Sequence, residues 1–460
     1  MFILLLVLTT LAYFSSTFSF SFISDDFFYL TFSRLADVIY PIQGFYHYSP
    51  VFWMLMWLLK SLFGYNSLPF HISAVVLHVV NVFIFYKVTS FFLKDKLSKY
   101  FTSVIFAFYF AHYEIVYWVT GIDMSLMILF YLLGFLAFSF FVKNLKSRYL
   151  FLYYFLFTIA ILTHEYAVSL PFVALFYWIF YSKVKIKLGA ITYILAMPVL
   201  VVFYLALIKL KEASSLFVQN PTAIRFTSSV VKSLLYLLFP FPDLIDFVSN
   251  RVLMALFLIV ISPLMIKSLK RKETLFLLIW LLITILVFSV TSLPQARYLS
   301  LSAIPAVLLI FRLFPVKSLV SFPSIYFSLI LISSILFLNK QKNYWEEASR
   351  ITRNVLSDIK SNYPNLPYGK ILYFVNLPDS VNGPPWNAYV FRNGLEHALA
   401  AQYKGVIPTI RYNRTIQIDG KVREDPQIEV EELKKLQVSG DIVFIFEKKI
   451  ESVRILDDGI

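Results

Sequence analysis

The sequence has no cysteine and few charged residues. Without cysteine the chain forms no disulfide framework, and cysteine usage says nothing about its redox compartment. Charged residues make up 15% of the 460 positions, against about 25% in ordinary soluble domains. Hydrophobic residues make up 59% and the mean hydropathy is +0.73. Apolar runs long enough to cross a bilayer recur, which indicates a multi-span membrane protein and a lipid environment.

The charges that are present are unevenly distributed along the chain. The formal net charge is +14, but residues 339–460 hold 17 basic and 16 acidic side chains, so nearly all of the excess lies in residues 1–338. In a membrane protein a basic balance usually reflects cytoplasmic loops. No basic groove interleaved with aromatic residues is visible, so nucleic acid is not expected as a partner.

The apolar runs predict about eleven transmembrane helices. The first run has no basic start and no convincing cleavage site, which favours a retained helix over a signal peptide. Val51–Phe63 is short and contains a lysine, so it is expected to lie in the membrane interface. The expected spans are 1–22, 70–93, 100–117, 122–142, 149–163, 166–182, 188–208, 252–266, 274–291, 298–311 and 319–338.

Short basic clusters between these spans predict the sidedness. They alternate as the positive-inside rule requires, near residues 94–99, 143–148, 183–187, 267–272 and 312–317. The face that carries them is expected to be cytoplasmic. This topology places the N-terminus inside the cell and the tail from Asn339 outside, in a multi-pass plasma-membrane protein.

Of the eleven acidic residues of the membrane part, Asp95 and Glu273 lie within the basic clusters, and the other nine gather on the opposite, outer face of this topology. That acids simply avoid the basic face explains part of the bias, but several of them stand in short loops between helices, where free polar segments are not expected. The nine acids predicted on the outer face are Asp25, Asp26, Asp37, Glu114, Asp123, Glu165, Glu212, Asp243 and Asp246.

Asp25 and Asp26 stand directly after the first apolar segment, which contains no ionisable side chain. A charged side chain inside hydrocarbon costs at least about 2.5–3.5 kcal/mol. A chain this apolar does not need acids there for stability, so the pair is a candidate site. Adjacent acids in an extended segment point in opposite directions, so one can face a cavity while the other orients a neighbour.

Four further stretches on the outer face carry candidate site residues. Each has a plainer alternative: an ordinary interfacial turn, a snorkelling acid or an interfacial anchor. An ionisable side chain this close to hydrocarbon is more often functional. The stretches are Tyr48-Ser49-Pro50, the loop with His112, Glu114, Trp118 and Asp123, the pair His164-Glu165, and Arg297-Tyr298.

The order of these motifs resembles the GT-C superfamily of membrane glycosyltransferases. It looks most like the protein O-mannosyltransferases and their prokaryotic relatives, including those that carry tetratricopeptide repeats. The resemblance covers residues 1–310 and rests on Asp25-Asp26, Tyr48-Ser49-Pro50, His71, His78, Asn81, His112, Glu114, Trp118, His164-Glu165 before Leu170-Pro171, and Arg297-Tyr298. Two features depart from the family: Ser49 replaces an arginine, and no tetratricopeptide repeats follow.

The resemblance implies a polyprenyl-phosphate-linked sugar as donor, with the sugar on the outer face. Asp25 is the candidate base, with Asp26 as the alternative, because a carboxylate ionised at neutral pH can take a proton from an acceptor hydroxyl. Arg297 is the candidate phosphate clamp, since arginine offers bidentate donors, and Lys209, Lys211 or Arg225 are candidate helpers. The remaining candidates for binding substrate or orienting the aspartates are Tyr48, His112, Glu114, Asp123, His164, Glu165 and Tyr298.

One base acting in one displacement would invert the anomeric centre. No cofactor is certain, and the sequence allows, without requiring, a divalent cation such as Mg²⁺ or Mn²⁺. A glycan, a lipid and a protein all remain open as acceptors. The loop at 209–250 is long enough to be functional and is expected either to cover a substrate entrance or to lie passively in the interface.

The composition changes after residue 338 and predicts a second domain. The expected domains are a transmembrane GT-C-like glycosyltransferase domain, 1–338, and an extracytoplasmic α/β domain, 339–460. The tail elements are a helix at Tyr344–Asn362, a strand at Lys370–Asn376, a helix at Gly394–Tyr403, a hairpin turn at Asp419-Gly420 and a strand at Asp441–Glu447. Gly383-Pro384-Pro385-Trp386 is expected to be a rigid exposed loop, either one that contacts substrate or, the favoured alternative, a plain turn.

Two other functions compete with a glycosyltransferase. A transporter or lipid-sugar flippase would also carry polar groups in the membrane, but such groups usually lie near the midplane and accompany internal repeats. A membrane scaffold whose exported domain binds a partner gives no reason for the acids, the histidine and Arg297 to converge. The sequence therefore favours an integral-membrane glycosyltransferase, with the transporter as the alternative.

Overall fold

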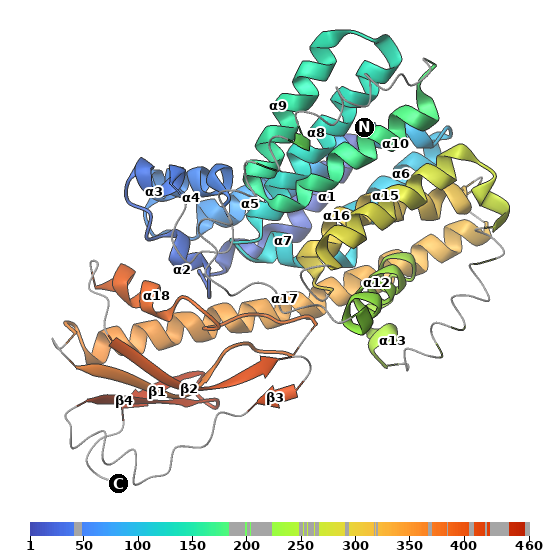
Figure 1. Ribbon diagram of the computed structural model, residues 1–460. Coiled ribbons are helices and arrows are strands. Elements are labelled where there is room, and N and C mark those ends of the chain that lie inside the picture. The colour runs from blue at the N-terminus through green and yellow to red at the C-terminus, as the bar shows by residue number, and fades with distance from the viewer. Residues whose placement is uncertain are drawn as a thin grey trace.

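The structure is a computed structural model of the chain. It describes residues 1–40, 48–183, 198, 199, 203, 223–247, 252, 255, 262, 266–289, 294–316, 318, 321–366, 370–383, 385–403, 409–418, 421–423 and 441–455. Figure 1 shows a bundle of helices with a small sheet domain beyond one end. The expected fold class, a polytopic helical membrane protein with a small C-terminal α/β domain, is confirmed.

Apolar runs of the sequence form the helices of the bundle. α8 packs against α5 and α9, and α16 packs against α15. The helices are α1 (Phe2–Phe14), α2 (Asp26–Tyr29), α3 (Leu35–Ile39), α4 (Pro50–Phe63), α5 (Leu68–Phe92), α6 (Lys96–Ala107), α7 (Tyr113–Tyr117), α8 (Ile122–Asn144), α9 (Ser147–Thr163), α10 (Ser169–Tyr181), α12 (Ala223–Leu238), α13 (Pro242–Phe247), α15 (Lys272–Ser289), α16 (Ala296–Leu313) and α17 (Phe322–Asn362). Short 3₁₀ helices are η1 (Ser15–Ser19), η2 (Phe110–His112) and η3 (Glu165–Val168).

Six helices in the described part of the chain are long and apolar enough to cross a membrane: those beginning at residues 2, 68, 122, 272, 296 and 322. Three shorter apolar helices accompany them, at Pro50–Phe63, Ser147–Thr163 and Glu165–Tyr181. The expected spans 188–208 and 252–266 lie almost wholly outside the described residues, so the predicted total of eleven stays a prediction.

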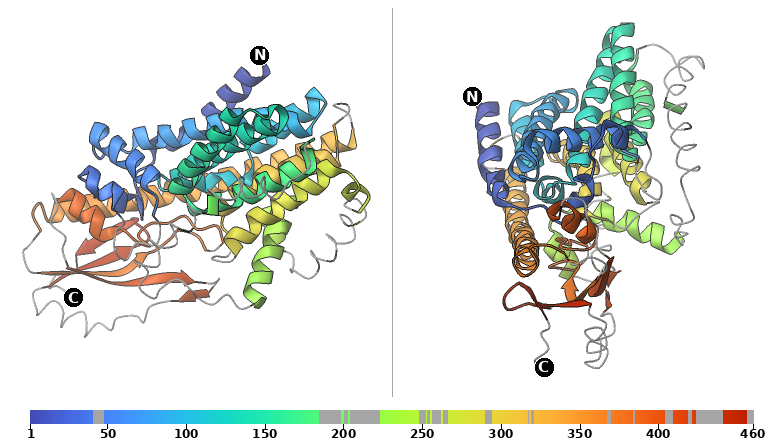
Figure 2. Two further views of the ribbon diagram at one scale, coloured as in Figure 1. Left: turned by 45° about the horizontal axis from the view of Figure 1, so that its top comes forward. Right: turned by 90° about the vertical axis from the view of Figure 1, so that its left-hand side faces the viewer.

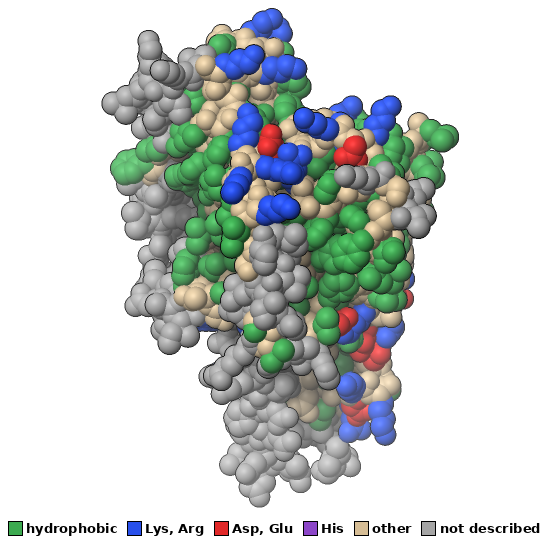
Figure 3. Space-filling model, turned by 90° about the vertical axis from the view of Figure 1, so that its right-hand side faces the viewer, with side chains coloured by type: hydrophobic (Ala, Val, Ile, Leu, Met, Phe, Trp, Pro, Cys, Tyr) green, Lys and Arg blue, Asp and Glu red, His purple; other side chains and the backbone are tan. Residues whose placement is uncertain are grey.

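The outer surface of the bundle is apolar. Leu4, Phe151 and Phe322 are exposed by 64%, 74% and 73%. Figure 3 shows such side chains as a broad surface, with Lys and Arg gathered in the upper part of this view and a second group, mixed with Asp and Glu, at its lower right. In Figure 2 the N-terminus and the C-terminal sheet lie at opposite ends of the molecule. That arrangement suits opposite membrane sides for the two, while the cytoplasmic assignment of the N-terminus stays a prediction.

The expected span at 100–117 is wrong as a continuous helix. α6 ends at Ala107, and the chain continues through η2 and the short helix α7. Every residue from Ile105 to Ile122 is buried, so this irregular backbone is enclosed by protein, the setting in which non-helical segments are tolerated in a membrane domain. Gly121 makes the return of the chain possible, because a Cβ there would stand 2.4 Å from the carbonyl oxygen of Glu114.

α17 joins the two domains as one helix of 41 residues, about 60 Å long. The sequence predicted a span at 319–338 and a separate amphipathic helix at 344–362, and that separation is wrong. The intervening residues are polar enough to suggest a linker, but Gln341 and Trp345 continue the buried face of the helix. The tail is therefore held to the bundle by continuous helix rather than by a linker (Figure 1).

The C-terminal domain is built on a five-stranded sheet of order β3-β2-β1-β4-β5. β1 pairs in parallel with β2 and β4, while β3 and β5 pair antiparallel at the two edges. The elements are β1 (Ile371–Pro378), α18 (Leu395–Gln402), β2 (Thr409–Ile418), β3 (Lys421–Arg423), β4 (Ile442–Glu447) and β5 (Ser452–Ile455). The predicted strands and helix are confirmed, and β5 was not predicted. The turn expected at Asp419-Gly420 lies outside the described residues.

Candidate active site

A cavity of about 440 Å³ lies between the helix ends and the C-terminal domain. It collects residues from the first loop (residues 20–25) and α2, from the α7–α8 loop and the first turn of α8, from the residue before η3, from the first turn of α16, and from α18 and the two residues before it. Its lining consists of Asp25, Phe28, Tyr29, Trp118, Thr120, Asp123, His164, Arg297, Tyr298, Asn393, Gly394, Glu396 and His397. Five of the candidate residues from the sequence, Asp25, Asp123, His164, Arg297 and Tyr298, thus meet at one place.

The two adjacent aspartates have different surroundings. Asp25 lines the cavity, whereas Asp26 is fully buried behind it. The Asp26 carboxylate accepts hydrogen bonds from the Thr120 amide at 2.8 Å, the Thr120 hydroxyl at 2.7 Å and the Ile23 amide at 3.0 Å. Burial raises the pKa of Asp26 to about 7, although the bonds from Ile23 and Thr120 lower it. Asp26 thereby ties the first loop to the α7–α8 loop, and Asp25 is the one presented to the cavity.

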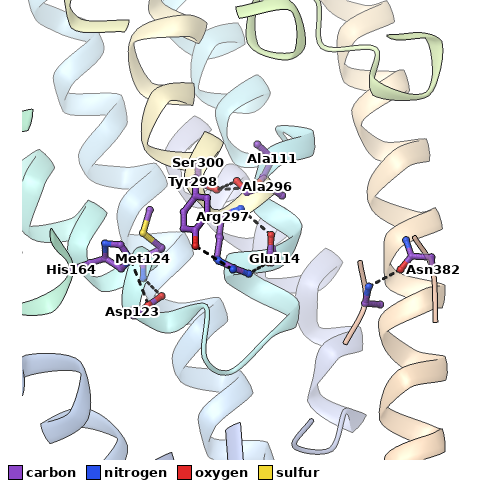
Figure 4. Close-up of polar contacts among 11 residues, drawn as sticks. Ala111, Glu114, Asp123, Met124, His164, Ala296, Arg297, Tyr298, Ser300 and Asn382 are labelled. Carbon is purple, nitrogen blue, oxygen red and sulfur yellow. Dashed lines mark hydrogen bonds and ion pairs between the residues drawn. The ribbon is translucent and has the colours of Figure 1, made fainter. Parts of the chain in front are cut away.

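Arg297 is held at the cavity by three groups. Its Nη1 donates to the Glu114 carboxylate, and its backbone amide donates to the same carboxylate at 3.0 Å (Figure 4). The guanidinium carbon lies 5.2 Å from the Trp118 ring centroid and 4.8 Å from that of Tyr298, within cation–π range. Glu114 is only 2% exposed, so it positions Arg297 rather than lining the cavity.

Asp123 and His164 form a second pair on the cavity wall (Figure 4). His164 Nε2 lies 3.9 Å from the Asp123 carboxylate. The Tyr166 amide donates to His164 Nδ1 at 3.3 Å, so a neutral ring carries its proton on Nε2, the nitrogen that faces Asp123. The second carboxylate oxygen of Asp123 accepts from the Met124 amide, which fixes the acid at the start of α8.

Four cavity residues come from the C-terminal domain, and the sequence did not single them out. Asn393, Gly394, Glu396 and His397 lie just before and within the first turn of α18. The segment that leads to these four residues is hydrogen-bonded to the first loop, because the Ser24 amide donates to the Val390 carbonyl at 2.9 Å. No local motif marks them, since only the docking of the tail brings them to Asp25. Tyr29 and Thr120 were missed as well.

The other predicted residues lie outside the cavity. Tyr48 donates its hydroxyl to the Ile39 carbonyl at 2.8 Å, which links the residue before Ser49 and α4 to the end of α3. His112 is fully buried, with its ring 4.7 Å from Phe106 and 5.0 Å from His78. Glu165 stands on the Nδ1 side of His164, at 3.8 Å.

None of the candidate helpers is among the described residues that line the cavity. Lys209 and Lys211 lie outside the described residues, and Arg225 stands at the start of α12, away from the lining. No group of three His, Asp or Glu side chains in the described ranges converges closely enough to hold a metal ion. Arg297 is accordingly the one Lys or Arg side chain among the described residues that line the cavity.

Trp386 is buried, so the expectation that this loop is exposed is wrong at that residue. Its side chain is 6% exposed and packs at 5.4 Å from Phe337 and 5.0 Å from Tyr236. Its indole N–H donates to Asp246 of α13 at 2.7 Å. The described part of the segment predicted as a loop at 209–250 contains the helices α12 and α13, and α13 contacts the C-terminal domain through this bond.

Comparison with known proteins gives a fold likeness. No protein-family model matches the chain, and no curated protein matches it. Among solved structures, ArnT from Cupriavidus metallidurans bound to undecaprenyl phosphate is 14% identical, with a TM-score of 0.50 over 97% of this chain and 93% of that chain. The apo state of the same protein is 13% identical, with a TM-score of 0.49 over the same shares.

At 14% identity the first of these likenesses shows the fold alone. The resemblance to the GT-C glycosyltransferases, expected from the order of the sequence motifs, stays a prediction, while the fold itself is like that of ArnT. This likeness in fold extends over both parts of the chain, because 97% of the residues are covered. The narrower resemblance to O-mannosyltransferases stays a prediction.

Proposed function

We propose that this protein is an integral-membrane glycosyltransferase. It moves a sugar from a polyprenyl-phosphate carrier to an acceptor on the outer face of the membrane, with inversion at the anomeric carbon. The observation that carries the proposal is the single cavity where Asp25 and Arg297 meet, because it offers a carboxylate base and a cation for a leaving phosphate in one place.

The reaction needs two groups, and the cavity supplies both. The acceptor oxygen bonds to the anomeric carbon while its proton passes to the Asp25 carboxylate. The bond between that carbon and the phosphate oxygen breaks, and the electron pair leaves with the lipid phosphate. Arg297 faces the charge that develops there, and its guanidinium has further N–H donors beyond the one given to Glu114.

Neighbouring side chains hold these groups in place. Glu114 and Trp118 fix the guanidinium, and Asp26 fixes the loop that carries Asp25. Burial, followed by the charge of Asp25, raises the pKa of Tyr29 well above its usual value. Tyr29 therefore remains a neutral hydroxyl in the cavity, suited to a sugar oxygen. Asp123 and His164 offer a matching acceptor and donor on the other wall.

The donor class draws support from the structural neighbour. ArnT from Cupriavidus metallidurans, which shares the fold over nearly its whole length, was crystallised with undecaprenyl phosphate. A lipid phosphate of that kind combines a long apolar tail, which the bilayer holds, with an anionic head suited to Arg297. We propose the same class of carrier here, with a hexosyl or mannosyl-type sugar.

The transporter alternative is favoured less by this arrangement. Ionisable groups of transporters usually lie near the bilayer midplane, on broken helices. In this chain Asp25, Asp123, His164 and Arg297 line a cavity that the C-terminal domain also lines. A site shared with an exported domain suits transfer at the membrane surface better than passage through it.

The test supplies polyprenyl-phosphate sugars, labelled in the sugar, to membranes that contain the wild type or Asp25→Asn. We expect label to leave the lipid with one donor, and the variant to lose this by at least a hundredfold while folding as the wild type does. Equal release by both proteins would remove Asp25 from the reaction. No release from any donor, with cell-envelope extract present as acceptor, would favour the transporter.

A further inference from the structure

We propose that the C-terminal domain forms the acceptor subsite of this cavity, through Asn393, Glu396 and His397. We infer further that the subsite takes an uncharged, hydroxyl-rich glycan rather than a phosphorylated acceptor. This inference rests on the proposed transferase function and names the acceptor class for that same site.

The two walls of the cavity come from different parts of the chain. Arg297 lies in the first turn of α16 in the helical bundle, whereas Glu396 and His397 belong to α18. α18 packs against α2 (Figure 1), the short helix that directly follows Asp25. In an inverting displacement the attacking oxygen and the leaving phosphate stand on opposite sides of the anomeric carbon. With the phosphate at Arg297, the acceptor approaches along the wall formed by Asp25 and α18.

This wall is built into the site and is not a loosely apposed surface. A Cβ on Gly394 would stand 2.0 Å from the Ser24 carbonyl oxygen, so the two segments of the chain are in contact through their backbones. The His397 ring packs edge to face against Phe28, with centroids 5.2 Å apart. The backbone N–H of Asn393 donates to the Ser24 hydroxyl at 3.4 Å. These contacts fix the first turn of α18 relative to Asp25.

The charge of the lining discriminates among acceptors. Asp25, Asp123 and Glu396 are acids, and the one arginine in the described lining, Arg297, is assigned to the phosphate of the donor. A phosphate group on the acceptor adds nearly two negative charges at neutral pH and would stand next to Glu396 and Asp25. Neutral hydroxyls instead donate to these carboxylates and accept from the Asn393 amide group.

Two further features suit a sugar ring. Nδ1 of His397 is buried without a hydrogen-bond partner in the described part of the chain, and a nearby hydroxyl can supply one. Phe28, Tyr29 and Trp118 add aromatic surface to the same cavity, against which the apolar face of a sugar ring can pack. Burial lowers the pKa of His397, so the ring is neutral at pH 7 and able to accept.

The experiment compares acceptors in the full-length protein, using the donor that the wild type accepts. The probes are neutral oligosaccharides, the same oligosaccharides carrying a phosphate monoester, and serine- and threonine-containing peptides. The variants are Glu396→Gln, Glu396→Lys and His397→Ala. Glu346→Gln is the matched control, since it removes an acid from the exposed side of α17 in the same domain. Binding is also read without activity, as protection of His397 by each probe from diethyl pyrocarbonate.

We expect the wild type to use neutral oligosaccharides at least tenfold better than their phosphorylated forms. Glu396→Gln and His397→Ala should raise the KM for acceptor about tenfold and leave the KM for donor unchanged. Glu396→Lys should shift the preference toward the phosphorylated form, and Glu346→Gln should behave as the wild type.

Preference of the wild type for phosphorylated oligosaccharides or for peptides would overturn the inference. Equal changes in the KM values for donor and acceptor would overturn it too, as would equal protection of His397 by neutral and phosphorylated probes. A different result would contradict the proposed function: none of the donor lipids loses its label in a reaction that depends on Asp25.

Discussion

Gly394 and Ser24 are in backbone contact across the two domains. A Cβ on Gly394 would lie 2.0 Å from the Ser24 carbonyl oxygen, and both residues have a positive φ, +87° and +47°. Ser24 directly precedes Asp25, so a residue of the C-terminal domain sets the backbone next to the proposed base. The domain is thus part of the site and not an appendage to it.

Gly394→Ala should therefore disrupt the site more than the small size of the added methyl group suggests. The added methyl group cannot fit, so α18 must move away from Ser24 and take Glu396 and His397 with it. We expect at least a tenfold loss of transfer and a lower melting temperature. Gly64→Ala is the matched control, because Gly64 also has a positive φ, +62°, but nothing lies within 4 Å of its Cβ position.

The Gly64 variant should show only the cost of backbone strain, about 1–3 kcal/mol, with transfer retained. Melting temperature in detergent and initial transfer rate are measured for both variants. If Gly394→Ala kept the rate of the wild type, the contact with Ser24 would not matter for the site.

Arg297 and Glu114 should behave as a coupled pair. Arg297→Met leaves the Glu114 carboxylate, only 2% exposed, without its cation, which typically costs about 3–5 kcal/mol. Adding Glu114→Gln removes the stranded charge and should restore most of the stability. Transfer should stay lost in both variants, because the phosphate clamp is missing from each. Thermal unfolding and transfer rates of the two single variants and the double variant check this cycle.

Recovery of transfer in the Arg297→Met/Glu114→Gln protein would contradict the proposed role of Arg297 in binding the phosphate. A double variant no more stable than Arg297→Met would contradict the pairing instead.

Asp26 should make stability depend on pH in a definite direction. Its folded pKa is raised to about 7 from 3.8, so between these values the folded protein binds the extra proton. Its contribution is present at low pH and lost as the pH rises through about 7. The stability advantage of the wild type over Asp26→Asn should shrink by up to about 4 kcal/mol between pH 4 and pH 8.

Asp37→Asn serves as the comparison for this pH series. Hydrogen bonding to the Arg34 amide lowers the pKa of Asp37, so its contribution is instead lost as the pH falls. Melting temperatures in detergent at several pH values separate the two trends. If the difference in melting temperature between the wild type and Asp26→Asn grew as the pH rises, it would contradict the view that the buried site of Asp26 favours the neutral form.

Trp386 should act as an anchor of the C-terminal domain. Trp386→Phe keeps an aromatic ring against Phe337 but leaves Asp246 without the indole donor. We expect a loss of about 1–3 kcal/mol and faster amide exchange around residues 385–391. Asp246→Asn should cost less, because its amide oxygen can still accept. Hydrogen exchange of the full-length protein measures both, and identical exchange in all three proteins would rule out the anchor.

Much of the fold followed from local pattern. Apolar runs gave the helices at 70–93, 122–142 and 274–291, because burial in lipid needs about twenty apolar residues whatever their order. The strands at 371–378 and 442–447 were visible in the sequence as short apolar runs, because they are buried in the core of the C-terminal domain. The break of the span at 100–117 was missed, since apolar composition does not distinguish a membrane helix from an irregular segment enclosed by other helices.

The candidate site was predicted in part. Asp25, Asp123, His164 and Arg297 stand out because an ionisable side chain beside hydrocarbon is rare, and they do line one cavity. Glu114 and Asp26 are also ionisable residues beside hydrocarbon, yet they lie behind the cavity and hold Arg297 and the α7–α8 loop in place. Sequence cannot make that distinction, because it depends on which side of the backbone each carboxylate faces after packing.

The sequence by itself determined that the chain is a membrane protein with an added α/β domain, and it marked the loops that hold charge. These properties depend on composition and on residues near each other in the chain. Only the tertiary structure decided that α17 runs unbroken between the two parts and that Asn393, Glu396 and His397 reach Asp25. Residues more than 360 positions apart meet there through the fit of Gly394 against Ser24, a contact that no local pattern of residues encodes.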